Sequence, residues 1–295
     1  MAEKPHTGRK AVLEPILWSS LFYTAGLVLV FVYLYPRIKD YIESNQIPTP
    51  EVSILPILGY FFGMVIVLGI IFFLVPVAKL KYILRVLFGV MYAWGIFIIL
   101  TLVMPPPAVV AIGAVLGLIW LFWPFIWLQN VLLLLALVSI GAVFGAVVTP
   151  WTLVWVLAAL SIYDILAVRL GYMMWMAKKL SETDTLPAFI LPKRLHDWGL
   201  NLRGTSFKKL FEEEAAERDF SLLGGGDLGF PLIFVASVFF AYDFFSALIV
   251  AVASLVGLIF AFLLQIYLLK GKPLPALPPI SLVTFAGFLI VYFTR

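Results

Sequence analysis

The sequence predicts an all-α polytopic membrane protein with nine transmembrane helices, an N-terminus in the cytoplasm and a C-terminus outside. Of its 295 residues, 63% are hydrophobic and only 12% are charged, whereas soluble domains average about 45–50% apolar and about 25% charged residues. Apolar runs such as 14–35 and 245–269 also exceed the roughly 20 residues that cross a hydrocarbon core. A soluble single-core enzyme is therefore excluded, and we expect a multi-pass protein of the cell membrane.

Proline, glycine and charged residues divide the apolar sequence into the expected helices. These lie near 14–35, 53–78, 82–104, 108–128, 131–148, 151–177, 224–242, 245–269 and 276–294. The first follows a polar, basic segment and is too long for a cleaved signal peptide, so we expect it to stay as an anchor. At about 1.5 Å per residue, the stretch 108–148 is too long for one crossing. A break at Gln129-Asn130 is expected to divide it.

The positions of lysine and arginine set the expected orientation, because positive charge collects on the cytoplasmic side of a membrane protein. With the N-terminus inside, 16 of the 20 basic residues flank the inner helix ends. They are Lys4, Arg9, Lys10, Lys79, Lys81, Arg85, Lys178, Lys179, Lys193, Arg194, Arg203, Lys208, Lys209, Arg218, Lys270 and Lys272. The chain then divides into a six-helix portion (1–177), a cytoplasmic loop (178–223) and a three-helix portion (224–295). Nucleic acid is not an expected partner, because the basic residues occur in short flanks.

The loop 178–223 is the one long polar segment, and it is too short to bury a core alone. Its basic first half is followed by an acidic run from Glu212 to Asp219. We expect a solvated helix face or a linker. A regulatory segment or a substrate gate is the alternative.

Two of the sixteen acidic residues, Asp164 and Asp227, lie deep in expected helices. A carboxylate there costs at least about 2.5–3.5 kcal/mol on insertion scales, so both need an explanation. Counted along the helices from Trp151 and Tyr242, the two acids are level within about one turn. Facing carboxyls in a low dielectric cannot both ionise cheaply and are expected to share a proton, as in aspartic proteases. Separate hydrogen bonds to neighbouring groups and a proton or cation relay remain alternatives.

Two irregular segments lie near expected helix starts. Gly224-Gly225-Gly226 directly precedes Asp227 and lets another backbone approach closely; a plain hinge is the alternative. The segment 272–279 contains four prolines, which forbid regular helix at its start and leave carbonyl groups unpaired. It is expected to be either a stiff turn or an edge on which an extended peptide pairs.

These motifs resemble those of a known family. Tyr163-Asp164, Gly224-Gly225-Gly226-Asp227 and Pro275-Ala276-Leu277 are similar to the YD, GxGD and PAL motifs of presenilins and signal peptide peptidases, in the same order. Gly225 departs from the pattern, since the family usually has leucine there. The expected cytoplasmic N-terminus resembles presenilins rather than the inverted signal peptide peptidases, and the compact chain resembles a microbial, archaeal-type homologue.

The resemblance implies an intramembrane aspartic-type endopeptidase with Asp164 and Asp227 as its catalytic pair. It also implies that Tyr163, the three glycines and Pro275, Ala276 and Leu277 shape the site and position the substrate. The implied partners are transmembrane helices with an external N-terminus and the lipid bilayer, and a homo-oligomer is left open. No cofactor or metal is implied.

The inventory of residues excludes other intramembrane proteases. The chain has no cysteine, and its two histidines, His6 and His196, lie outside the expected spans. A zinc protease and a serine protease that uses a membrane histidine are therefore excluded. The remaining rivals are a secondary transporter that uses the two acids as a relay and a noncatalytic protein that binds helices.

Overall fold

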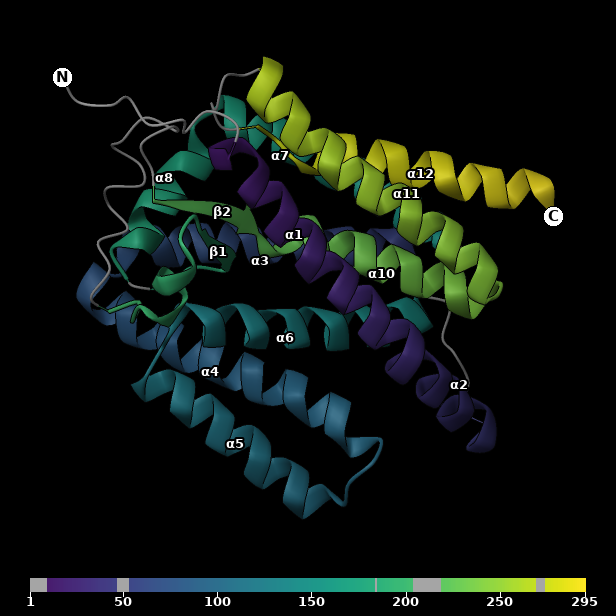
Figure 1. The fold of residues 1–295 in the computed structure, drawn as a ribbon, viewed down its shortest axis with the longest axis horizontal. Coiled ribbons are helices and arrows are strands. Elements are labelled where there is room, and N and C mark those ends of the chain that lie inside the picture. Colours follow the sequence, from purple (N-terminus) through teal and green to yellow (C-terminus); the bar gives the residue numbers. More distant parts are fainter. Residues whose placement is uncertain (1–9, 47–52, 184, 204–218, 269–273) are drawn as a thin grey trace.

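The computed structural model describes residues 10–46, 53–183, 185–203, 219–268 and 274–295. Most of them are helical (Figure 1). The helices are α1 (Lys10–Leu29), α2 (Tyr35–Ser44), α3 (Ile54–Leu74), α4 (Val77–Thr101), α5 (Pro106–Phe122), α6 (Ile126–Val147), α7 (Pro150–Arg169), α8 (Tyr172–Ser181), α10 (Gly225–Ala241), α11 (Phe244–Leu263) and α12 (Leu277–Thr294). The π-helical turn η1 (Val30–Leu34) joins α1 to α2, and η3 (Leu264–Leu268) extends α11. Two strands, β1 (Ala188–Pro192) and β2 (Phe220–Gly224), and the 3₁₀ turn η2 (Leu195–Gly199) complete the fold.

Among the described residues, seven helical segments are long and apolar enough to cross a membrane. They are Glu14–Ser44, Ile54–Leu74, Val77–Thr101, Ile126–Val147, Pro150–Arg169, Phe244–Leu268 and Leu277–Thr294. Two apolar helices, α5 and α10, are shorter. These helices confirm the prediction of a largely α-helical, multi-pass membrane protein.

Small residues let the helices of the bundle approach closely. A Cβ atom on Gly145 of α6 would lie 2.1 Å from the Cβ of Ala236 on α10, and one on Gly287 of α12 would lie 2.4 Å from the Cβ of Ala253 on α11. Such contacts are typical of transmembrane packing, where the close approach of backbones replaces the hydrophobic driving force. They fix α10 against α6 and α12 against α11.

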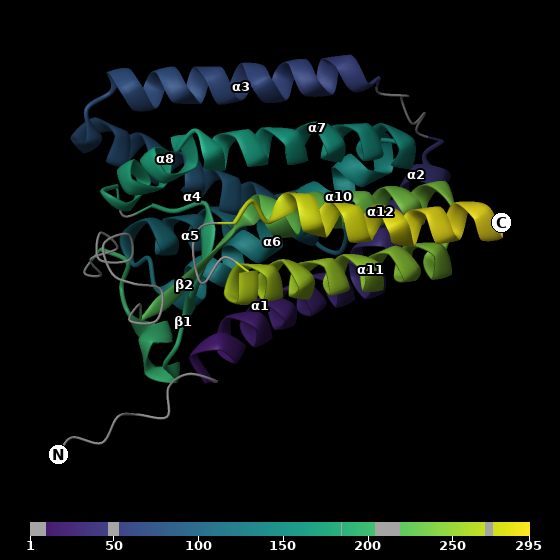
Figure 2. The same ribbon diagram turned by 90° about the horizontal axis from the view of Figure 1, so that it is seen from above.

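Helix α3 is the outermost helix and runs beside α7 (Figure 2). Its apolar side chains are largely exposed, for example Leu55 at 82% and Phe73 at 77%. An exposed apolar surface of this size is favourable in contact with lipid and unfavourable in contact with water. It therefore agrees with a helix that faces the bilayer.

The predicted loop 178–223 contains a two-stranded sheet, and the expectation of a solvated helix or linker is wrong for this part. Strands β1 and β2 pair antiparallel from Ala188 opposite Gly224 to Pro192 opposite Phe220. Phe189 and Ile190 are fully buried, because helices pack around the sheet at one end of the bundle (Figure 1). The acidic residues 212–217 lie outside the described residues, as do Lys208, Lys209 and Arg218.

Three predicted helix ends are also wrong. The break predicted between 78 and 82 lies at Val75 and Pro76, so α4 begins at Val77. The single helix predicted for 151–177 is divided by Gly171, whose φ of +74° suits glycine and ends α7. The break predicted at Gln129-Asn130 lies instead at 123–125, and both amides belong to α6.

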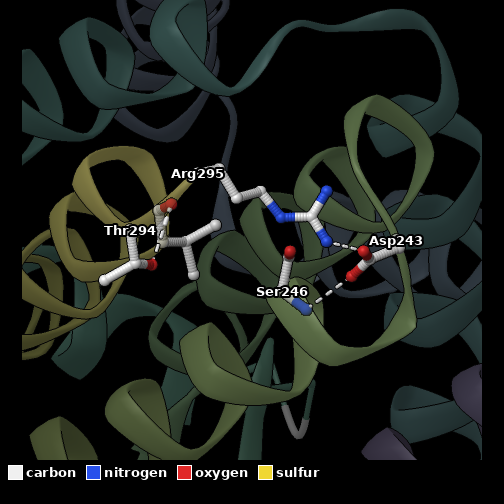
Figure 3. A network of polar contacts seen from close by, with 5 residues as sticks. Asp243, Ser246, Thr294 and Arg295 are labelled. Atoms are coloured by element: carbon white, nitrogen blue, oxygen red, sulfur yellow. Dashed lines mark hydrogen bonds and ion pairs between the residues drawn. The ribbon is translucent and has the colours of Figure 1, made fainter.

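An ion pair joins the end of α12 to the turn between α10 and α11 (Figure 3). Asp243 caps α11 by accepting a hydrogen bond from the backbone N–H of Ser246 at 2.8 Å, and its other carboxylate oxygen pairs with the guanidinium group of Arg295. The guanidinium carbon also lies 5.9 Å from the ring centre of Tyr242. These contacts hold together the ends of α10, α11 and α12 that lie away from the sheet.

Candidate active site

Asp164 lies on α7, in a helix with a well-defined start. The side chain of Thr149 accepts a hydrogen bond from the N–H of Thr152 at 3.2 Å, and Pro150 takes the first helical position, which suits proline. The Asp164 side chain is buried, and its residue is 9% exposed. Its Oδ2 accepts a hydrogen bond of 3.2 Å from the backbone N–H of Leu277, the first residue of α12.

Asp227 lies in the first turn of α10, three residues after the end of β2. Its carboxyl accepts a hydrogen bond from the backbone of Gly224 and interacts electrostatically with Asp164. The first turn of a helix favours a negative group, because the unpaired N–H groups there carry partial positive charge. The structure therefore places the carboxyl of Asp227 within range of an electrostatic interaction with Asp164.

Pro275, Ala276 and Leu277 lead into α12 beside Asp164. Pro275 and Ala276 precede the helix, and Leu277 is buried at its first position. The N–H groups of a first turn have no partner within their own helix, so the N–H of Leu277 is available to the carboxylate. Lys272 and Pro273, from the predicted proline segment, lie outside the described residues.

Tyr163 adjoins Asp164 in sequence but faces another helix. Its ring centre lies 5.9 Å from that of Phe61 and 6.0 Å from that of Phe62, both on α3. Phe61 also contacts Phe230 of α10, at 6.3 Å between ring centres. Tyr163 therefore joins α7 to α3 at the level of the acids. Phe61 has no distinguishing sequence pattern, since it belongs to a uniformly apolar helix.

The three glycines differ in their surroundings. Gly224 ends β2, whereas Gly225 is buried and its N–H donates to the carbonyl oxygen of Pro187 at 3.0 Å. A Cβ atom on Gly225 would lie 3.2 Å from that oxygen and within 4 Å of Leu133 and Leu137 of α6. A Cβ atom on Gly226, which is exposed, would meet only the ring of Phe230. The departure from the family pattern at Gly225 thus coincides with a tightly packed position.

Sequence reasoning missed two residues next to this site. Gln129 and Asn130 are fully buried, and their side chains bond to the backbone around β1. A polar pair inside an apolar run is the signal that could have found them. It indicates either a helix end or a buried polar contact, and the second holds here.

The arrangement is suited to proton transfer. In general, two carboxyls close together in a site of low dielectric favour a state with one proton between them, in which one group is a base and the other an acid. Within the described ranges there is no cluster of three or more histidine, aspartate or glutamate residues that could hold a metal ion.

Comparisons with known proteins agree with this geometry. The profile of the family described as signal-peptide peptidase, presenilin aspartyl protease matches residues 45–295. Among solved structures, the chain is similar in fold to a presenilin family intramembrane aspartate protease, with a TM-score of 0.63 and 18% sequence identity. That match covers 95% of this chain and 100% of the other. A search of curated proteins found no match.

Proposed function

Because the chain belongs to the signal-peptide peptidase and presenilin aspartyl protease family, we propose that Asp164 and Asp227 are its catalytic pair. The chain is an intramembrane aspartyl protease, a multi-pass membrane protein that acts on transmembrane proteins within the bilayer. The assignment is supported by the burial of Asp164 and its hydrogen bond from Leu277, and by the position of Asp227 in the first turn of α10, within electrostatic range of Asp164.

The proposed reaction needs one ionised and one protonated carboxyl. The carboxylate takes a proton from water, whose oxygen attacks the scissile carbonyl carbon, while the carboxylic acid gives its proton to the carbonyl oxygen. Collapse of the tetrahedral intermediate breaks the C–N bond, and the leaving nitrogen receives a proton from the pair. The hydrogen bond from Leu277 to Asp164 supports this cycle, because it fixes one carboxylate oxygen without consuming the shared proton.

A peptide bond inside a helix is shielded by its own turn, so the substrate must unwind beside the acids. We propose that its freed backbone pairs with the chain where it enters α10, at Gly224, Gly225 and Gly226, and where it enters α12, at Pro275, Ala276 and Leu277. In support, the register of the sheet turns the N–H and C=O groups of Leu222 away from β1, close to the start of α10. A strand edge of this kind accepts an extended peptide.

We further propose that all nine apolar segments cross the membrane, with α5 and α10 as the two short ones. The N-terminus is then cytoplasmic and the C-terminus is outside, as the placement of lysine and arginine indicates. The portions 1–177 and 224–295 contribute one aspartate each, and 178–223 is the cytoplasmic segment between them. Substrates would be helices with an external N-terminus, as for presenilin-like, archaeal-type homologues. The size of the reconstituted active species tests whether the protein works as a homo-oligomer.

The test is cleavage of a transmembrane peptide by the full chain reconstituted in liposomes. Asp164→Asn and Asp227→Asn keep the shape of the side chains but remove the acid, so each is expected to abolish cleavage while the thermal transition persists. The matched control is Asp243→Asn, which changes an acid at the other end of the bundle and should keep the activity at low temperature. Persistent cleavage by either of the first two variants would refute the assignment. An ion-coupled transporter, the alternative use of two membrane acids, is not favoured by the comparisons.

A further inference from the structure

Two amide side chains of α6 bind the backbone around strand β1. Asn130 donates from Nδ2 to the carbonyl oxygen of Ile190 at 2.6 Å, and its Oδ1 accepts from the N–H of the same residue at 2.9 Å. Gln129 donates from Nε2 to the carbonyl oxygen of Leu186 at 2.8 Å. Its Oε1 accepts from the indole N–H of Trp120 at 2.8 Å. Both amides are fully buried.

The register of the sheet explains which backbone groups these amides reach. Gly225 donates to Pro187, and Lys193 donates to Asp219, each at 3.0 Å. In an antiparallel ladder, alternate residues bond to the partner strand and those between them point away. Ile190 is therefore one of the residues whose N–H and C=O point away from β2. The side chain of Asn130 bonds to both groups of Ile190 on this edge of β1. It supplies the donor and the acceptor that the backbone of a third strand would otherwise supply.

The sheet in turn is bonded to the start of α10. The carbonyl oxygen of Pro187 accepts from the N–H of Gly225, the first residue of α10. Gly224, opposite Ala188 in the sheet, bonds to the carboxyl of Asp227. The chain from Leu186 to Ile190 is thus bonded to α6 at both ends, and between them Pro187 is bonded to the first residue of α10.

Resting on the proposed function, we propose that Asn130, supported by Gln129, is a positioning residue for the reaction. By holding β1 against α6, it sets the place at which β2 passes into α10, and so the position of the Asp227 carboxyl relative to Asp164. The two amide side chains also cover the edge of β1 that faces away from β2. Geometry of this kind matters strongly to rate, because a displacement of about 1 Å at a reacting centre can cost roughly 100-fold.

The experiment uses the full chain in liposomes with a fluorogenic transmembrane peptide. Asn130→Leu keeps the approximate shape and removes both bonds. We expect kcat to fall by roughly 10- to 100-fold, since a displaced catalytic group is the cause, with KM changed little. The matched control is Ser139→Ala on the same helix. Ser139 is equally buried and bonds at 2.8 Å to the carbonyl oxygen of Gly95 on α4, away from the sheet. The Ser139→Ala variant should unfold at a lower temperature without a loss of kcat.

Asn130→Asp provides a test that remains useful if Asn130→Leu does not fold. A protonated carboxylic acid offers the same donor and acceptor as an amide, whereas a carboxylate only accepts and would repel the carbonyl oxygen of Ile190. The ratio of the variant's kcat to that of the wild type should therefore rise as the pH falls. Taking the ratio removes the titration of the catalytic acids, which both proteins share.

Amide hydrogen exchange of the peptide 186–192 supplies a readout that does not depend on catalysis. Faster exchange at Ile190 in Asn130→Leu, together with the loss of kcat, would support the proposal. A kcat for Asn130→Leu unchanged from the Ser139→Ala control, or a kcat for Asn130→Asp that stays at the wild-type value once its carboxyl has ionised, would overturn it. Failure of the proposed function would look different, because then Asp164→Asn and Asp227→Asn would still cleave the peptide.

Discussion

The backbone N–H of Leu277 lies 3.2 Å from Oδ2 of Asp164, although 113 residues separate them in the chain. The contact joins the start of α12 to one of the two membrane carboxyls, while β2 and Gly224 lead to the other. The candidate site is therefore formed by three helix segments, and each of them can be tested separately.

The first prediction concerns the hydrogen bond itself. Leu277→Pro removes the N–H donor at the first residue of α12, where no intrahelical hydrogen bond is lost, and it also disfavours the αR conformation of Ala276. A hydrogen bond to a charged group contributes about 1.5–3 kcal/mol, so kcat should fall roughly 10- to 100-fold. Leu277→Ala is the control, since it also removes the buried side chain but keeps the N–H. Equal kcat values for the two variants in the reconstituted cleavage assay would contradict the prediction.

The two acids and their motifs are predictable from the sequence, but the contacts that position them are only partly so. An acid in an apolar run, glycines before it and prolines before the last helix are each local patterns. The pairing of Asn130 with Ile190 joins residues 60 positions apart, and no local pattern indicates its partner. The same amide pair was predicted as a helix break, because a polar pair in an apolar run suits either a helix end or a buried contact.

The strands were missed for a related reason. β1 and β2 have five residues each, and apolar runs of that length in a polar loop give no periodicity that distinguishes a strand from irregular chain. Their order depends on α6 and α1, for example through the contact of Phe22 with Phe189 at 5.4 Å between ring centres. The division of α7 from α8 depends on the positive φ of Gly171, and a lone glycine within a helical run is often tolerated.

The second prediction concerns the packing of α10 on α6. In Gly145→Ala, the new Cβ would overlap Ala236 at 2.1 Å and the carbonyl oxygen of Ile233 at 2.9 Å. Overpacking of this kind costs about 1–3 kcal/mol. Because α10 carries Asp227, its displacement should lower both the thermal transition and the cleavage rate.

The control for this change is Gly63→Ala on α3, where a Cβ would meet nothing within 4 Å. This variant should leave the unfolding temperature and the cleavage rate unchanged or slightly higher, because alanine stabilises a helix by up to about 1 kcal/mol relative to glycine. Similar losses in the two variants would show that a general effect of glycine replacement, and not the α6 contact, is responsible.

The third prediction separates stability from activity at the far ends of the helices. Asp243→Ala removes both the cap of α11 and the ion pair with Arg295 (Figure 3). Loss of a helix cap costs about 0.5–2 kcal/mol, whereas the partly exposed ion pair alone contributes at most about 1 kcal/mol. Asp243→Ala should therefore lower Tm more than Arg295→Ala does. Cleavage well below Tm should be unaffected in both, and a double-mutant cycle on Tm measures the ion pair.

The last prediction concerns Gly225, where the family usually has leucine. Its Cβ would lie 3.2 Å from the carbonyl oxygen of Pro187, 3.7 Å from Leu137 and 3.8 Å from Leu133. Gly225→Leu therefore forces the start of α10 away from β1 or from α6. Overpacking of this kind costs about 1–3 kcal/mol of stability, so the thermal unfolding temperature should fall, and the displacement of α10 should lower the cleavage rate as well.

Leu137→Ala tests whether packing is the cause. Leu137 also contacts Gly229, at 3.1 Å from a Cβ built there, so shortening it opens space along one face of α10. The double variant Gly225→Leu with Leu137→Ala should recover a large part of the lost cleavage, whereas Leu137→Ala alone should be destabilised by an unfilled cavity. If the two changes were simply additive, the clash with the carbonyl oxygen of Pro187, and not the clash with Leu137, would be the cause. In that case Gly225→Ala, which adds only one carbon, should already reduce cleavage as much as Gly225→Leu does.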